Sequence, residues 1–150
     1  MKLVLRSDYS FTMSVVGYQF PSLATVPYDS NWLNIKISVR HPDGDWTAVD
    51  QALLTYEVQE LADWFRDLAA GERGKRNIDF LEPCLKFDVE LNEDSSEDLK
   101  VTLAHWFQPP WSKELDDEFQ LTFPLATINL VKTAEAVERE LARYPQRTAH

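Results

Sequence analysis

Apolar and polar residues alternate without interruption between positions 33 and 40. Because successive side chains of a β-strand point to opposite faces, this pattern predicts a strand with one apolar and one polar face. Such a strand is typical of an antiparallel sheet that is covered on a single side. Residues 41–45 then contain Pro, Asp and Gly, which favour a hairpin turn, so residues 46–49 are predicted to return as the partner strand.

The same alternation predicts five further strands, whose ranges are 9–15, 77–82, 85–91, 99–107 and 119–123. The polar and acidic residues 92–98 are predicted to form a turn, and residues 22–29 a loop. Pro109 and Pro110 are expected to end the 99–107 strand, because proline lacks the backbone N–H that a strand ladder needs.

Two segments show the three- and four-residue spacing of amphipathic helices. The first begins at Thr55, a suitable N-cap, and ends before Gly71, where a left-handed cap residue is favoured. The second runs from about Thr127 to Tyr144 and is ended by Pro145. The chain is therefore predicted to form one α+β domain over residues 1–150. In this domain two amphipathic helices pack on a largely antiparallel sheet of about six to seven strands.

The protein carries 15 basic and 25 acidic side chains, which gives a formal net charge of −10. Nucleic-acid phosphates and anionic membrane surfaces repel such a chain, so neither is an expected partner. A cationic protein is the expected partner instead, for example a nuclease with a basic cleft. Acidic composition also promotes solubility by itself, and this second explanation stays open.

The single cysteine, Cys84, cannot form an internal disulfide, so nothing in the sequence requires an oxidising compartment. The apolar run at residues 3–5 is too short for the core of a signal peptide. The longest uncharged stretch, residues 119–131, is too short and too polar for a membrane helix. A cytoplasmic location is the expectation.

The histidines, the cysteine and the glycines do not have the spacing of a known catalytic, metal-binding or phosphate-binding motif. None of the three histidines, His41, His105 and His150, lies three or four residues from another histidine or from the cysteine, so no zinc site is expected. His105 falls on the apolar face of its predicted strand, which favours a packing role. The four glycines form no phosphate-binding loop. No catalytic residue, metal or cofactor is predicted.

Acidic segments and tryptophans are the features best suited to binding a protein. Aromatic side chains with charged surroundings make binding hot spots, and acidic groups steer a basic partner towards them. The predicted partner-binding residues are Tyr28, Asp29, Trp32, Trp46, Glu93, Asp94, Glu97, Asp98, Trp106, Trp111, Asp116 and Asp117. For these tryptophans the alternative, that the rings belong to the core, has equal weight.

Several blocks of the sequence resemble the WapI-type immunity proteins, the cognate inhibitors of bacterial wall-associated toxins. The most specific block is YDSNWLNI at residues 28–35. The shorter blocks are LLTYEV at 53–58, FLEPCL at 80–85, PPW at 109–111, FPL at 123–125 and LARYP at 141–145. The resemblance covers the chain from about residue 9 to residue 147.

This resemblance implies a small cytosolic antitoxin that binds and blocks a toxin domain, often a nuclease, delivered by neighbouring bacteria. It implies neither enzymatic activity nor a cofactor. Two alternatives from other classes stay open. One is a small-molecule-binding or enzymatic domain with a pocket between sheet and helices, lined by His105, Trp106 and Glu82. The other is a self-associating structural protein, such as a homodimer.

Overall fold

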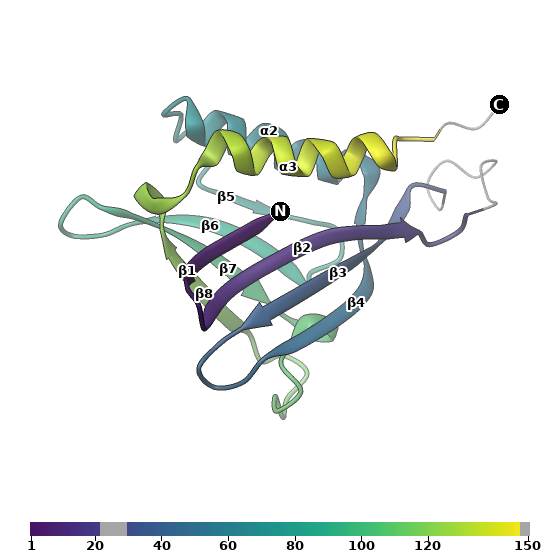
Figure 1. Cartoon of the computed structure of the whole chain (residues 1–150), viewed down its shortest axis with the longest axis horizontal. Coiled ribbons are helices and arrows are strands. Elements are labelled where there is room, and N and C mark those ends of the chain that lie inside the picture. The colour runs from purple at the N-terminus through teal and green to yellow at the C-terminus, as the bar shows by residue number, and fades with distance from the viewer. Residues whose placement is uncertain (22–29, 148–150) are drawn as a thin grey trace.

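In the computed structural model, which describes residues 1–21 and 30–147, eight strands form two four-stranded sheets (Figure 1). Every strand pairing in both sheets is antiparallel. The α+β class and the antiparallel pairing predicted from the sequence are confirmed. The structure has eight strands divided between two sheets where a sheet of about six to seven strands was predicted, because the first helix carries the chain away from the first sheet before the second sheet begins.

The first sheet has the strand order β1-β2-β3-β4. Its strands are β1 (Lys2–Arg6), β2 (Tyr9–Tyr18), β3 (Trp32–Arg40) and β4 (Trp46–Leu54). The alternating residues 33–40 lie in β3, where the apolar set is buried and faces the core, as predicted. Strand β1 has no counterpart among the predicted strands, because Leu3 is the one residue of this short strand that is buried.

The second sheet has the strand order β5-β6-β7-β8. Its strands are β5 (Asn77–Asp79), β6 (Leu85–Leu91), β7 (Glu97–Leu103) and β8 (Phe119–Pro124). Strand β6 has the predicted bounds, and β8 extends one residue beyond them. The predicted 99–107 strand is wrong at its C-terminal end, since β7 stops at Leu103.

The two sheets face each other across one hydrophobic core. Phe87 lies where the layers meet: its ring centroid is 6.2 Å from that of Phe11 in the first sheet and 5.8 Å from that of Phe65 in the first helix. All three side chains are fully buried. This arrangement buries the apolar faces of both sheets and of the helix together, which is the main driving force for the fold.

Two helices, α2 (Thr55–Ala69) and α3 (Leu130–Arg143), lie side by side across one end of the sheets (Figure 1). Arg66 of α2 and Glu138 of α3 form an ion pair between them, with Nε 2.9 Å from Oε2. Gly71 follows α2 with a φ of +84°, and the N–H of Glu72 donates to the carbonyl oxygen of Asp67, as a left-handed cap requires.

The predicted starts of both helices need correction. Leu54, and not Thr55, is the N-cap of α2, and the Glu57 carboxylate accepts its backbone N–H at 3.0 Å. Strand β4 therefore runs into α2 without a loop. Helix α3 begins after Asn129, whose side chain accepts the Lys132 N–H at 3.1 Å, so it starts three residues later than predicted. The predicted loop at residues 22–29 lies outside the described residues.

Candidate partner-binding surface

The chain reverses direction where β7 ends, and this reversal places an aromatic side chain on the surface. His105 has a φ of +51°, and residues His105–Phe107 form the short 3-10 helix η1. Phe107 is fully buried, whereas His105 and Trp106 are exposed. The predicted packing role of His105 is therefore wrong, because the left-handed backbone ends the strand alternation on which that prediction rested.

Trp106 is 73 % exposed and Leu115 is 78 % exposed, which are high values for large apolar side chains. Both line an open hollow of about 470 Å³, here named the Trp106 hollow. The residues that line it are His105, Trp106, Gln108, Pro109 and Leu115. Exposed apolar side chains around a concave site are typical of an interaction surface.

The loop that carries Leu115 is held in place by the side chain of Gln108. The Gln108 amide nitrogen donates to the carbonyl oxygens of Glu114, at 3.1 Å, and Leu115, at 3.3 Å, and also to that of Asp117. The Asp117 carboxylate in turn accepts the backbone N–H of Glu114 at 3.2 Å. These hydrogen bonds hold the loop that forms one side of the hollow in place in the absence of a partner.

A cluster of aromatic rings packed edge to face lies next to η1. Trp46 of β4 donates its indole N–H to the carbonyl oxygen of Phe107 at 3.1 Å, which ties η1 to the first sheet. The Trp46 ring lies 5.3 Å from that of Trp111 and 5.1 Å from that of Phe119, in edge-to-face geometry. Trp111 also packs on Gly44, where a Cβ atom would lie 2.7 Å from Cζ3 of the indole.

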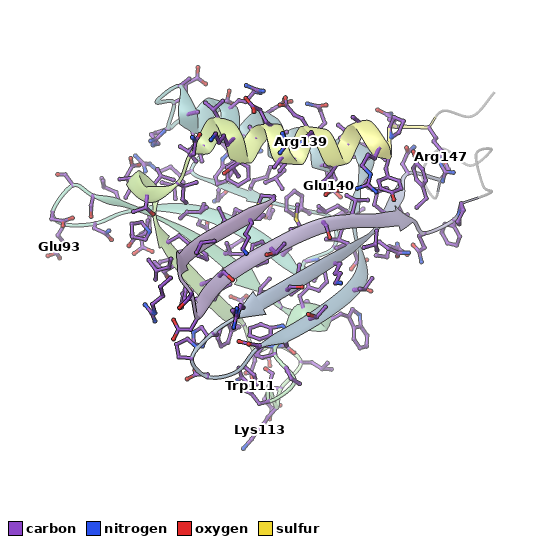
Figure 2. All side chains as sticks on the ribbon, viewed as in Figure 1. Glu93, Trp111, Lys113, Arg139, Glu140 and Arg147 are labelled. Atoms are coloured by element: carbon purple, nitrogen blue, oxygen red, sulfur yellow. The ribbon has the colours of Figure 1, made fainter. Side chains whose placement is uncertain are left out.

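Exposed carboxylates lie on the two loops at this end of the molecule. The loop before β8 carries Glu114, Asp116, Asp117 and Glu118, with Lys113 as its one basic residue. The β3–β4 turn, which touches the same loop through Gly44 and Trp111, adds Asp43 and Asp45. We call the turn at residues 41–46 together with residues 105–118 the acidic aromatic end; it lies opposite the helices, around the labels of Trp111 and Lys113 (Figure 2).

The second acidic segment predicted from the sequence lies elsewhere. Glu93 marks the tip of the β6–β7 hairpin, which extends from another edge of the molecule (Figure 2). Its carboxylates are also engaged: Asp94 accepts the Ser96 N–H at 3.0 Å, Asp98 accepts the Asn92 amide at 3.0 Å, and Glu97 pairs with Arg73 at 2.9 Å. The Arg73 hydrogen bond lowers the pKa of Glu97. The two acidic segments therefore do not form one surface.

The comparison with protein families decides what kind of molecule carries this surface. The model of the WapI-like immunity protein family matches residues 4–145 of the chain. This chain belongs to that family. The resemblance found in the sequence blocks is thus confirmed, and with it an association with toxin immunity. No curated protein and no solved structure matches the chain.

For this member of the immunity family, the structure separates the predicted partner-binding residues into groups. Trp106, Trp111, Asp116 and Asp117 lie together at the acidic aromatic end, and Glu93, Asp94, Glu97 and Asp98 lie in and beside the β6–β7 hairpin. Trp32 and Trp46 are 5 % and 7 % exposed, so their rings belong to the core and not to an exposed binding face. Tyr28 and Asp29 lie outside the described residues.

Two important residues of this end were not singled out from the sequence. Leu115 stands alone among charged residues in the segment KELDDE, and an isolated apolar residue in an acidic loop is the signal that marks it. Gln108 has no such signal, because its role depends on three backbone carbonyls of a loop that follows six to nine residues later.

The described part of the chain gives little support for a reactive cysteine, for the postulated polar pocket or for a metal site. Cys84 is buried, and loss of solvation raises the pKa of its thiol to about 12. Glu82 does not line the Trp106 hollow, so the polar pocket postulated with His105 and Trp106 is not assembled there. Within residues 1–21 and 30–147, no group of three His, Cys, Asp or Glu side chains is placed to hold a metal ion. Neither helix described here has the length and apolar character needed to cross a membrane.

Proposed function

We propose that this protein is a non-catalytic antitoxin that acts in the cytoplasm, where it binds and neutralises a toxin domain, specifically a nuclease with a basic cleft. The match of the immunity family model to residues 4–145 carries the proposal. Immunity by binding needs a surface complementary to the toxin and no catalytic group, and the acidic aromatic end is a surface of that kind.

Charge supports the choice of a nuclease. A cleft that binds the phosphates of a nucleic acid is basic, and an inhibitor with a net charge of −10 is attracted to it over long distances. The 113–118 loop and the 41–46 turn carry exposed carboxylates at the same end of the molecule as exposed Trp106 and Leu115. Apolar anchors supply affinity after docking, while the carboxylates increase the rate of encounter.

The proposal is tested by co-expressing the tagged protein with the product of the neighbouring gene and purifying the complex. We expect a stoichiometric complex in which the toxin domain no longer degrades nucleic acid. The direct control adds purified protein to the free toxin domain and follows substrate cleavage. Full nuclease activity at an excess of the protein, with no complex on a sizing column, overturns the proposal.

A further inference from the structure

We propose that the Trp106 hollow receives one arginine side chain of the partner, with the guanidinium stacked on the Trp106 indole. This inference deepens the proposed function, on which it rests for the identity of the partner as a basic toxin domain. Its physical basis is the size, order and charge of the hollow.

The hollow is large enough to admit an arginine side chain. Its volume of about 470 Å³ is open to solvent, and the exposed indole of Trp106 and the side chain of Leu115 form part of its lining. A stable protein interface buries far more surface than one side chain, so we assign the hollow as one anchor point within a larger interface. Tryptophan is among the residues most often found at such anchor points.

The hollow is ordered without a ligand. The η1 segment that carries Trp106 is tied to β4 through the Trp46 indole and the Phe107 carbonyl, and the loop that carries Leu115 is tied to Gln108 through three carbonyl oxygens. An anchor site that is already formed loses little conformational entropy on binding. The backbone on both sides of the hollow is therefore held before a ligand binds.

The charge around the hollow selects its occupant. A guanidinium is planar, stacks on an indole face and donates to carboxylates in a fixed geometry, whereas an ammonium group is a strongly hydrated point charge. Glu114 and Asp116, the two exposed carboxylates on either side of Leu115, are the acceptors on the loop that lines the hollow. A nucleic-acid base also stacks on tryptophan, but its phosphates are repelled by these carboxylates, as are anionic lipid head groups.

The test uses peptides on the full chain, so that it does not depend on isolating the toxin. The probes are Ac-Gly-Arg-Gly-NH2, its lysine analogue and the triglycine analogue, and the readout is the indole N–H signal of each tryptophan in a two-dimensional NMR spectrum. We expect a saturable shift of the Trp106 signal, assigned by its loss in Trp106→Phe, with binding several-fold tighter for arginine than for lysine. Equal shifts with all three peptides, or no shift of Trp106, overturn the inference.

A second measurement separates this inference from the proposed function. With the toxin domain, Trp106→Ala is expected to weaken binding on the order of tenfold or more, whereas Leu91→Ala, which truncates an apolar side chain that is 58 % exposed on the hairpin edge, leaves it unchanged. Normal binding of the toxin by Trp106→Ala would contradict the anchor role of Trp106 and would leave the antitoxin function supported. If no toxin is bound while the arginine peptide still shifts Trp106, the antitoxin function falls. A dimer in light scattering that Trp106→Ala dissociates assigns the hollow to a second copy and overturns the inference.

Discussion

The side chain of Asn31 forms two reciprocal hydrogen bonds with the backbone of Arg147, which lies 116 residues further along the chain. The Asn31 amide nitrogen donates to the Arg147 carbonyl oxygen at 2.8 Å, and the Arg147 N–H donates to the Asn31 amide oxygen at 2.8 Å. The same amide oxygen accepts the Thr55 hydroxyl at 2.9 Å. One buried side chain therefore joins the start of β3, the start of α2 and the segment after α3.

The guanidinium of Arg147 extends this junction to the end of β2. It donates to the carbonyl oxygens of Phe20, Pro21 and Ser30, at 2.8 Å and 2.9 Å for the first two, and lies 3.7 Å from the centroid of the Tyr18 ring. Both of these partners of the Asn31 side chain, Thr55 and Arg147, are distant from it in sequence.

Replacing Asn31 with alanine is expected to destabilise the protein by about 1–3 kcal/mol, because the buried Thr55 hydroxyl and the partly buried backbone of Arg147 lose this partner. Urea unfolding followed by far-UV circular dichroism measures the change. Asn77→Ala, at an exposed position of β5, is the matched control and is expected to remain within about 0.5 kcal/mol of the parent protein. Equal stabilities of the two variants would show that the Asn31 junction contributes nothing.

Reversing two exposed charges of the acidic aromatic end is expected to slow association with a basic toxin domain. In Glu114→Lys/Asp116→Lys the association rate at low salt falls roughly tenfold, and its dependence on salt weakens. Asp117 is left in place because its carboxylate holds the backbone of the loop. Stopped-flow fluorescence measures the rate, and the control is Glu93→Lys on the hairpin, combined with Glu72→Lys to match the change in charge. A larger effect in the hairpin variant would place the toxin on that edge instead.

Gly44→Ala is expected to destabilise the acidic aromatic end. Gly44 has a φ of +144°, and an added Cβ would lie 2.7 Å from Cζ3 of Trp111, so the variant combines backbone strain with a clash. The expected loss is about 1–3 kcal/mol. A double-mutant cycle with Trp111→Ala checks the cause, because removing the ring relieves the clash and leaves the strain. Gly74→Ala, where no atom lies within 4 Å, is the control. Strict additivity of the two changes would exclude the clash.

Glu97→Gln is expected to reduce stability at neutral pH and to have no effect in strong acid. The hydrogen bond from Arg73 lowers the pKa of Glu97 in the folded protein. A carboxyl whose pKa is lowered on folding adds stability above its unfolded pKa, and this stability is lost as the pH falls through the folded pKa. The partly exposed pair contributes up to about 1 kcal/mol. Urea unfolding at several pH values measures the difference; a gap between variant and parent that persists unchanged in strong acid would contradict it.

Cys84 is expected to be inert in the folded protein. Burial raises the pKa of its thiol to about 12, so almost no thiolate is present at pH 8. A chromogenic thiol reagent should therefore react at once in denaturing urea and very slowly without it. Rapid labelling of the native protein would show that Cys84 is accessible, and would reopen a role for it in chemistry.

The sequence by itself determined the local structure of most of the chain. Alternation from position 33 to 40 placed Leu33 and Ile35 on the buried face of β3, and the three- and four-residue spacing placed Val58 and Phe65 on the buried face of α2. These predictions succeed because the direction of a side chain is set by the geometry of its own backbone, and burial of apolar area then selects the face.

Tertiary structure alone decided which distant residues meet. The alternation of β7 does not predict that His105 takes a positive φ and that Trp106 is therefore exposed. Nor does it predict that the Trp46 indole, some sixty residues earlier, donates to the Phe107 carbonyl oxygen. Nor does the sequence show that one acidic loop lies beside Trp106 while the other lies on a different edge of the molecule. The physical reason is that strand partners and loop neighbours are selected by packing of the whole core, and the periodicity of a single segment carries no information about them.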